Sequence, residues 1–211
     1  MKGVIFDMDG LMFDTERLWK KEWKAMADSL GIKLEPVFHK EITGTSGDLM
    51  LQVIAKYYHT DKPQYIADMV RTAVEEDLQV ELPEKPGLHE ILEACRERGY
   101  LIAAASSSPK ELIISNLERA HVLPYFNAIC CGVDVENGKP APDIFLLAAN
   151  KLELEPSSCY VLEDSYNGIR AAYTAGCKAI MVPDMQEPTI EMEEKAAHIC
   201  RSLYDVIPYL S

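Results

Sequence analysis

The stretch that decides the fold is GVIFDMDGL, which occupies residues 3–11. Its first four residues are apolar or small, as in a short buried strand, and two carboxylates, Asp7 and Asp9, then stand two residues apart. In an open parallel sheet, ligands bind beyond the carboxyl ends of the strands, which is where this pair would lie. An acidic turn in solvent is the ordinary alternative. An EF-hand loop is excluded, because its required acid and glycine positions fall on Leu11 and Met12.

Four further apolar runs alternate with helical patterns along the later part of the chain. Between them, apolar residues recur at the i, i+3, i+4 spacing of amphipathic helices, and Gly99 and Gly176 follow two of these patterns as C-terminal caps. Strands that alternate with helices of this length pair in parallel through right-handed crossovers. The sequence therefore predicts an α/β fold with a doubly wound parallel sheet, whose strands are residues 3–6, 101–105, 128–131, 159–162 and 179–182.

Residues 15–83, between the first strand and the rest of the sheet, have a different pattern. Amphipathic helical segments follow one another there, beginning with the segment that carries Trp19 and Trp23, and no convincing strand interrupts them. We therefore expect a small all-helical domain of residues 15–83, inserted into a core of residues 1–14 and 84–211. The two crossings between the domains would lie close together and act as a paired hinge.

Two of the other strand ends carry groups that suit a phosphate. Ser106, Ser107 and Ser108 follow the second predicted strand, and Pro109 is expected at the first position of the helix that they open. Hydroxyls and backbone N–H groups at such a helix start can hold a phosphate, although a capping serine turn looks the same in sequence. Lys139 follows the third strand in the stiff turn Gly-Lys-Pro, where a solvated lysine is the ordinary alternative.

A second acidic pair, Glu163 and Asp164, follows the fourth predicted strand, where Asp164 or Ser165 could equally serve as a helix N-cap. The resulting order along the strand ends is acid pair, hydroxyl, lysine, acid pair. This order resembles that of the haloacid dehalogenase superfamily of phosphoryl-transfer enzymes. The matching segments are DMDG (residues 7–10), Ser106, GKPAPD around Lys139 and VLEDS around Glu163 and Asp164.

The resemblance covers nearly the whole chain and implies a Rossmann-like catalytic core, with the helical insertion standing where the family has its small cap domain. Within the superfamily, the motifs DxDGL and GKPAPD are most similar to those of the β-phosphoglucomutase and sugar-phosphatase branch. Each motif alone is a weak signal, whereas the ordered set is specific.

A phosphate monoester resists attack because its anionic oxygens repel nucleophiles, so its hydrolysis needs neutralised charge and an aligned attacker. Mg²⁺ prefers oxygen ligands, which Asp7, Asp164 and the backbone carbonyl of Asp9 would supply. Glu163 would bind the ion directly or through water. The free oxygen of Asp7 would attack phosphorus and form an aspartyl-phosphate. Asp9 would act first as general acid and then as general base.

Further residues would bind the substrate. Ser106 would donate to a transferring phosphoryl oxygen, and Lys139 would offset the charge that the nucleophile and the phosphate share. Ser107 and Lys110 would add to the phosphate pocket, Lys110 with positive charge. Trp19 would face the pocket from the helical insertion, although packing within that insertion is its ordinary role. The five histidines lie outside all the motifs and are expected to be structural or solvated.

The insertion decides between hydrolysis and isomerisation. The phosphoglucomutase members of the family have a cap histidine and a basic pair, and the corresponding positions here are Trp19, Thr43 and Gly47. We therefore expect a Mg²⁺-dependent phosphatase of a small phosphorylated metabolite, a sugar phosphate in class. A phosphoglucomutase-type isomerase is the alternative, and a non-catalytic protein that senses phosphate or metal is a third reading.

The 211 residues are 48% hydrophobic and 26% charged, which is typical of an ordinary globular protein. With 21 Lys and Arg against 34 Asp and Glu, the formal net charge is −13, so neither nucleic acid nor a membrane surface is an expected partner. An anionic substrate would need a metal ion or a locally basic pocket. The six cysteines lack C-x-x-C spacing, which predicts reduced core residues. No signal or membrane segment is evident, so we expect a cytoplasmic protein. Its acidic composition and the lack of an obvious apolar seam favour a monomer.

Overall fold

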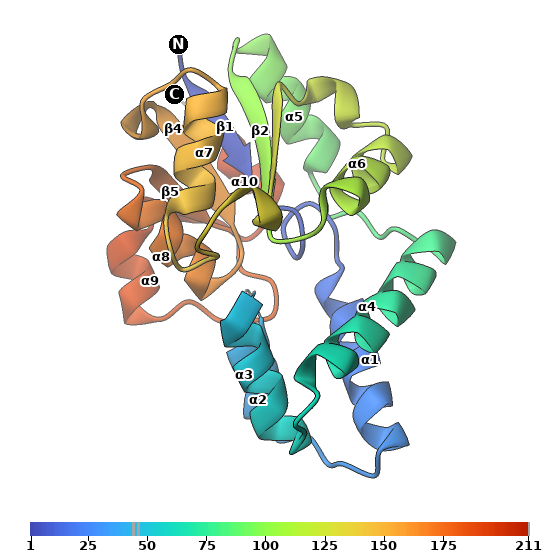
Figure 1. Cartoon of the computed structure of the whole chain (residues 1–211). Helices are drawn as coiled ribbons and strands as arrows, with labels where there is room; N and C mark the ends of the chain where they lie inside the picture. The colour runs from blue at the N-terminus through green and yellow to red at the C-terminus, as the bar shows by residue number, and fades with distance from the viewer. Residues whose placement is uncertain (44, 46, 211) are drawn as a thin grey trace.

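The computed structural model describes residues 1–43, 45 and 47–210 and consists of a sheet-based core and a helical unit beside the carboxyl ends of its strands (Figure 1). Within the described residues the sheet has six strands, all parallel, in the order β3-β2-β1-β4-β5-β6. Their bounds are β1 Gly3–Phe6, β2 Leu101–Ser106, β3 Ala128–Cys131, β4 Cys159–Glu163, β5 Lys178–Met181 and β6 His198–Ile199. The doubly wound α/β fold is thus confirmed.

The predicted strands agree with the first five observed strands to within one residue at each end. The sequence does not predict β6, because its two residues are exposed at the edge of the sheet and form no apolar run.

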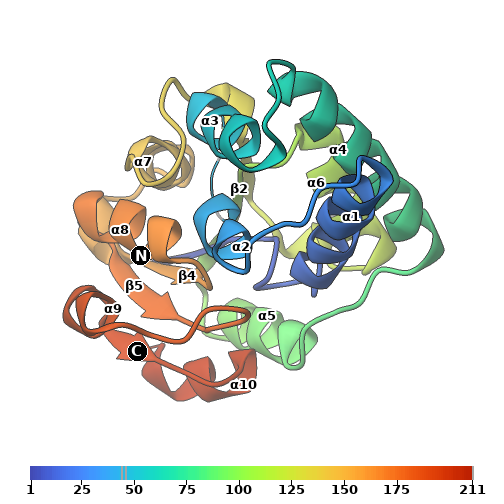
Figure 2. The same cartoon turned by 90° about the horizontal axis from the view of Figure 1, so that it is seen from below.

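Helices cover both faces of the sheet (Figure 1; Figure 2). In β1, Val4 and Phe6 belong to one buried cluster of side chains, and Ile5 belongs to another on the opposite face of the sheet. Burial on both faces explains why this strand is apolar throughout. The core helices are α5 Leu88–Glu97, α6 Lys110–Arg119, α7 Asp143–Lys151, α8 Tyr166–Thr174, α9 Ile190–Lys195 and α10 Leu203–Val206, with 3-10 turns at Leu123–Tyr125, Gly132–Asp134, Pro156–Ser158 and Ile207–Tyr209.

The expected helix ends are largely confirmed. Gly99 and Gly176 follow α5 and α8 with φ of +72° and +79°, the left-handed conformation that glycine adopts most readily. Pro109 is a correction, because its ψ of 147° is extended and places it before the first residue of α6 rather than within the helix. All six cysteines are buried and free, which confirms them as core residues. No helix among the described residues has the length and apolarity needed to cross a bilayer.

The helical unit comprises α1 Glu16–Ser29, α2 Val37–Ile42, α3 Gly47–Tyr58 and α4 Pro63–Val80. Its own core is centred on Phe38, whose ring lies 5.7 Å from that of Trp23 and 5.8 Å from that of Tyr58. The sequence pattern does not predict α2, because six residues are too few to show a helical period. These side chains form a cluster separate from the two that cover the sheet.

The two crossings between the core and the helical unit lie side by side. The amide of Asp14 donates to the carbonyl of Pro83 at 2.8 Å, and the amide of Lys85 donates to that of Met12 at 2.9 Å. The Lys85 ammonium also lies 3.6 Å from Asp14 Oδ1 and 2.5 Å from an oxygen of Asp184, in the loop after β5. Both ends of the helical unit are therefore held at one place on the core.

Candidate active site

Three carboxylates from neighbouring strand ends form a buried cluster. β1 leads into Asp7 and β4 into Glu163 and Asp164, and one oxygen from each lies within 4.8 Å of the others. The strands bring them together because Phe6 and Leu162, one residue before, are paired in register. These carboxylates are at most 6% exposed. Hard oxygen ligands at this spacing suit a divalent cation.

The cluster carries more negative charge than its surroundings neutralise. Burial raises the pKa of Asp7 to about 8; Lys139 opposes the shift, and Glu163 adds to it. Burial also raises the pKa of Asp164 well above its ordinary value, with Glu163 and Asp7 adding to the effect. A bound divalent cation would offset both effects.

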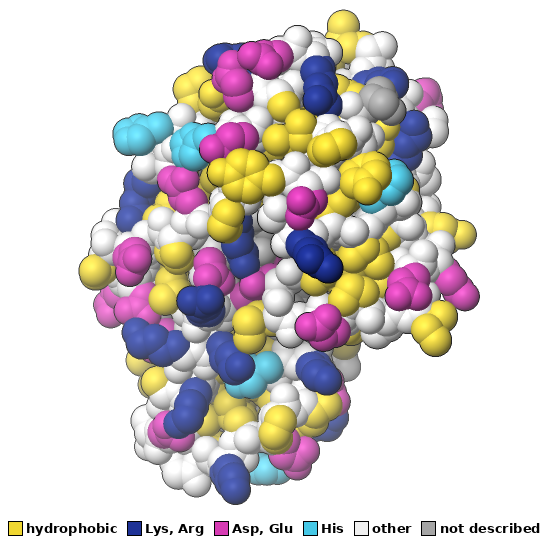
Figure 3. All heavy atoms as spheres, turned by 180° about the vertical axis from the view of Figure 1, so that it is seen from behind, with side chains coloured by type: hydrophobic (Ala, Val, Ile, Leu, Met, Phe, Trp, Pro, Cys, Tyr) yellow, Lys and Arg dark blue, Asp and Glu magenta, His cyan; other side chains and the backbone are white. Residues whose placement is uncertain are grey.

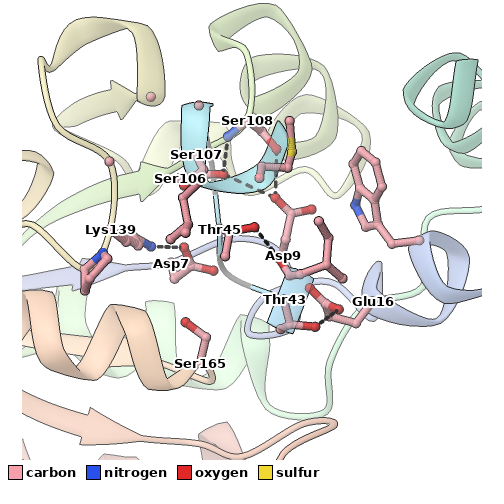
Figure 4. Close-up of a pocket in the computed structure, with 18 of the residues that line it drawn as sticks. Asp7, Asp9, Glu16, Thr43, Thr45, Ser106, Ser107, Ser108, Lys139 and Ser165 are labelled. Atoms are coloured by element: carbon pink, nitrogen blue, oxygen red, sulfur yellow. Dashed lines mark hydrogen bonds and ion pairs between the residues drawn. The ribbon is translucent and has the colours of Figure 1, made fainter. Parts of the chain in front are cut away.

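Lys139 connects two of these carboxylates. Its ammonium lies 2.5 Å from Asp7 Oδ1 (Figure 4) and 2.8 Å from Glu163 Oε1, and the residue is 4% exposed. Burial alone would lower the pKa of Lys139, but the carboxylates of Asp7 and Glu163 raise it above the ordinary value. The lysine is therefore held charged inside the cluster and is not a solvated loop residue.

Glu163 is fixed from a second side by the start of α8. Its Oε2 accepts from the amide of Ser165 at 2.6 Å, and the Ser165 hydroxyl in turn caps α8 by accepting from the amide of Gly168 at 3.0 Å. A Cβ atom at Gly168 would lie 1.8 Å from the Glu163 carboxyl carbon. Glycine is therefore required for Glu163 to occupy this position.

Asp9 is held apart from the three-carboxylate cluster by hydroxyl groups. Its Oδ1 accepts from Thr15 Oγ1 at 2.7 Å, and its Oδ2 accepts from Ser108 Oγ at 2.8 Å and Ser106 Oγ at 3.2 Å. Figure 4 shows the carboxylate beside these serines. Three donors thus fix the orientation of a partly exposed carboxylate. The backbone carbonyl of Asp9, which is the group predicted to bind the metal, takes no part in these hydrogen bonds.

A cavity of about 1050 Å³ lies between the core and the helical unit and contains these groups. Its walls include basic side chains of the helical unit, namely Lys20, Lys40 and Arg71. Figure 3 shows several Lys and Arg side chains over the lower part of the back face. Arg17, Lys20, Lys21 and Lys24 of α1 are exposed. An anion in the cavity meets the positive charge of Lys20, Lys40 and Arg71 despite the net charge of −13.

Residues 4–182 match the family model of haloacid dehalogenase-like hydrolases. The chain belongs to this family. A phosphorylated carbohydrates phosphatase of Thermotoga maritima is 32% identical over 181 residues, which cover 85% of this chain and 84% of that protein. The β-phosphoglucomutase of Bacillus subtilis is 31% identical over 196 residues, covering 86% and 83%. The crystal structure of a hydrolase from Pseudomonas syringae has a TM-score of 0.86 at 26% identity and covers 100% of this chain and 98% of that one.

In this haloacid dehalogenase-like hydrolase, the structure brings nearly all the predicted site residues to one cavity. Those that line it are Asp7, Asp9, Trp19, Ser106, Ser107, Lys139, Glu163 and Asp164. Lys110 is a correction to the sequence analysis: it is exposed and does not line the cavity. The reason is that α6 begins at Lys110, and only residues 106–109 before it face inward. Trp19 lines the cavity and also stacks on Trp23, with ring centroids 6.2 Å apart.

The most prominent cavity residue that the sequence does not single out is Glu16. It is the first residue of α1, and its Oε2 accepts a 3.3 Å hydrogen bond from Thr43 Oγ1. Burial raises the pKa of Glu16 to about 8, with Asp9 and Asp184 adding to the effect. Its position directly after the first crossing is the one sequence signal that could have identified it.

Gln186 and His39 also line the cavity without being predicted there, and Ser108 of the predicted serine cluster lines it as well. Gln186 is 7% exposed and lies in the loop after β5, from which its Nε2 donates to the backbone carbonyl of Lys40 at 3.4 Å. Burial lowers the pKa of His39, and nearby Lys20 adds to the effect. No motif in the sequence points to Gln186 or His39.

Proposed function

We propose that this hydrolase is a Mg²⁺-dependent phosphatase of a small phosphorylated metabolite, a sugar phosphate in class, and that it acts through an aspartyl-phosphate on Asp7. The observation that carries the proposal is the placement of two carboxylates at one cavity in different surroundings. Asp7 lies against the Lys139 ammonium among the metal-binding carboxylates, whereas Asp9 is held by hydroxyl donors. The name of the Thermotoga maritima relative supports the substrate class.

Asp7, Glu163 and Asp164 would hold the Mg²⁺ ion, together with the backbone carbonyl of Asp9. The donor set fits, because the cluster has three buried carboxylates and the Lys139 ammonium pairs with only two of them, Asp7 and Glu163, so negative charge is left unpaired. The ion, when bound, supplies neutralisation of the phosphoryl oxygens.

The residues of the chain then divide the remaining work. An oxygen of Asp7 attacks phosphorus, the bond from phosphorus to the leaving oxygen breaks, and Asp9 gives that oxygen a proton. In the second half, Asp9 removes a proton from the water that attacks the aspartyl-phosphate, which releases phosphate and restores Asp7. Lys139 offsets the charge shared by Asp7 and the phosphoryl group, and Ser106 donates to a phosphoryl oxygen.

The helical unit would act as the cap, with residues 15–83 moving about the paired crossings. A cavity enclosed between the two parts excludes bulk water from the intermediate once substrate is bound. The basic residues Lys20, Lys40 and Arg71 would attract the phosphate ester against the net charge.

The isomerase alternative is favoured by the similarity to a β-phosphoglucomutase. Hydrolysis is the better proposal, because the side chains at the corresponding cap positions carry no cation. Trp19 stacks on Trp23, and Thr43 donates to Glu16 instead of holding a second phosphate.

Phosphate release from a panel of sugar phosphates, polyol phosphates and nucleotides tests the proposal. The assay is run with Mg²⁺, with a chelator, and with Asp7→Asn as the control for contaminating phosphatases. We expect metal-dependent release that the Asp7→Asn variant lacks. Isomerised sugar phosphate without net release would instead establish the mutase, and neither outcome with folded protein would contradict both.

A further inference from the structure

Glu16 is a cavity carboxyl group that the proposed chemistry does not use. It lines the cavity at the start of α1 and lies beside Thr43 (Figure 4). Among the described residues it has no ion pair, and its one hydrogen bond is the 3.3 Å contact from Thr43 Oγ1. Lys20 stands one helical turn further along α1, yet no ion pair joins the two. A carboxylate can accept about four hydrogen bonds, so most of the acceptor capacity of Glu16 is unfilled.

A carboxyl group in this position is unfavourable for the empty fold. Glu16 is half-buried, so its carboxyl group is only partly solvated, and this loss of solvation together with the charges of Asp9 and Asp184 raises its pKa. No contact of the side chain within the helical unit compensates for it beyond the long Thr43 bond. The compensating partner is therefore best sought in the cavity, among the groups that a ligand brings.

The place of Glu16 in the cavity indicates which part of a substrate it meets. The phosphoryl group is taken up by Asp7 and Lys139, on the core side of Asp9. The leaving alcohol extends beyond Asp9, which protonates it, toward the helical unit. Glu16 comes from that unit, and Figure 4 shows it on the other side of Asp9 from Asp7 and Lys139. It therefore faces the leaving alcohol rather than the phosphoryl group.

Glu16 is only half-buried and lines the cavity, so a ligand there can reach its carboxyl group. A hydroxyl of the leaving alcohol would donate to it, whereas an anion at this place would meet the Glu16 carboxyl.

We infer that Glu16 is a specificity-determining residue that accepts a hydrogen bond from a hydroxyl of the leaving alcohol. The substrate is accordingly a phosphomonoester of a polyhydroxylated alcohol, such as a polyol or an open or cyclic sugar, with no second anion near Glu16. This inference rests on the proposed phosphatase function and deepens it.

Two esters that differ only in hydroxyl groups test the inference. Glucitol 6-phosphate and hexyl phosphate both carry phosphate on a primary carbon of a six-carbon chain, and phosphate release from each gives kcat/KM. We expect Glu16→Ala to lower kcat/KM for glucitol 6-phosphate about tenfold, as for loss of one hydrogen bond. The value for hexyl phosphate should change less than about threefold, which also shows that the variant is folded. Glu16→Gln keeps an acceptor and should lose less than Glu16→Ala.

Glu136→Ala is the matched control, because Glu136 lines the same cavity but is exposed at its edge. It should leave both values within about threefold of the wild type. An equal loss for both esters in Glu16→Ala, no loss for either, or a wild-type preference for hexyl phosphate would overturn the inference and leave the phosphatase intact. A wild-type protein that releases phosphate from neither ester nor from p-nitrophenyl phosphate would overturn the proposed function and this inference with it.

Discussion

Replacement of Lys139 by methionine gives the most demanding test of the site. Methionine has a similar length without the charge, so Lys139→Met removes the ammonium and leaves the packing against the Phe145 ring, which the ammonium now faces at 5.0 Å. Asp7, Glu163 and Asp164 then remain buried with no cation in contact. The variant should lose both stability and activity.

The loss of stability follows from the two short ion pairs of Lys139. At an effective dielectric constant of about 20, unit charges about 3 Å apart attract by ~5 kcal/mol, and the desolvation of the buried ammonium offsets several kcal/mol of the total. Breaking a buried pair by removing one partner typically costs ~3–5 kcal/mol. For a chain of this size, that corresponds to a melting temperature lower by roughly 6–20 °C.

Thermal melts in chelator at pH 8 and at pH 5 measure this loss. It should be larger at pH 8, because without the ammonium the pKa values of the neighbouring carboxyl groups rise further and the folded state must hold their protons. Added Mg²⁺ should restore part of the lost stability. Lys151→Met, which removes an exposed ammonium 3.3 Å from Asp134, is the control and should cost less than ~1 kcal/mol.

Activity gives an independent measure of the same residue. Lys139→Met should lower kcat/KM by about a hundredfold or more, the effect of removing one charge-stabilising group from a transition state. A loss below about threefold, or a melting temperature equal to that of Lys151→Met, would refute the reasoning that places Lys139 between the nucleophile and Glu163.

Three further changes test other parts of the site. Asp7→Asn should abolish phosphate release, by about a thousandfold or more, without unfolding the chain; measurable wild-type rates would exclude Asp7 as nucleophile. Gly168→Ala should displace Glu163 and weaken Mg²⁺ binding about tenfold or more, measured by Mg²⁺ titration of the melting temperature; unchanged affinity would contradict the contact. In chelator, stability should fall as pH rises from about 4.5 to 8, because folded Glu16 keeps its proton to about pH 8 and the unfolded chain does not. Glu16→Gln should flatten that fall in urea unfolding, and equal slopes would oppose it.

The core half of the site could be predicted because its residues follow strands. Parallel strands deliver their carboxyl ends to one edge, so Asp7, Lys139 and Asp164 could be assigned to one place from their positions after apolar runs. Their order along the chain then carried the resemblance to the family. The prediction for Lys110 was wrong because the helix begins one residue later than expected, at Lys110 itself, and the side chain is exposed.

The half of the site that the helical unit supplies could not be predicted from local pattern. Which face of α1 meets the cavity depends on how the unit packs, through Trp23 and Phe38, and on where its two crossings are tied. Glu16 is one acid among the 34 Asp and Glu residues and carries no motif of its own. Gln186 reaches the cavity only because the loop after β5 contacts α2.

Asp9 stands where these two halves meet. Its carboxylate is held on one side by Ser106 and Ser108 from the end of β2, and on the other by Thr15 from the first crossing into the helical unit. Thr15 is fully buried at this crossing. The residue that would protonate the leaving alcohol is thus oriented by the same segment that positions Glu16 against that alcohol. Proton transfer and choice of leaving group are therefore linked through one turn of the chain.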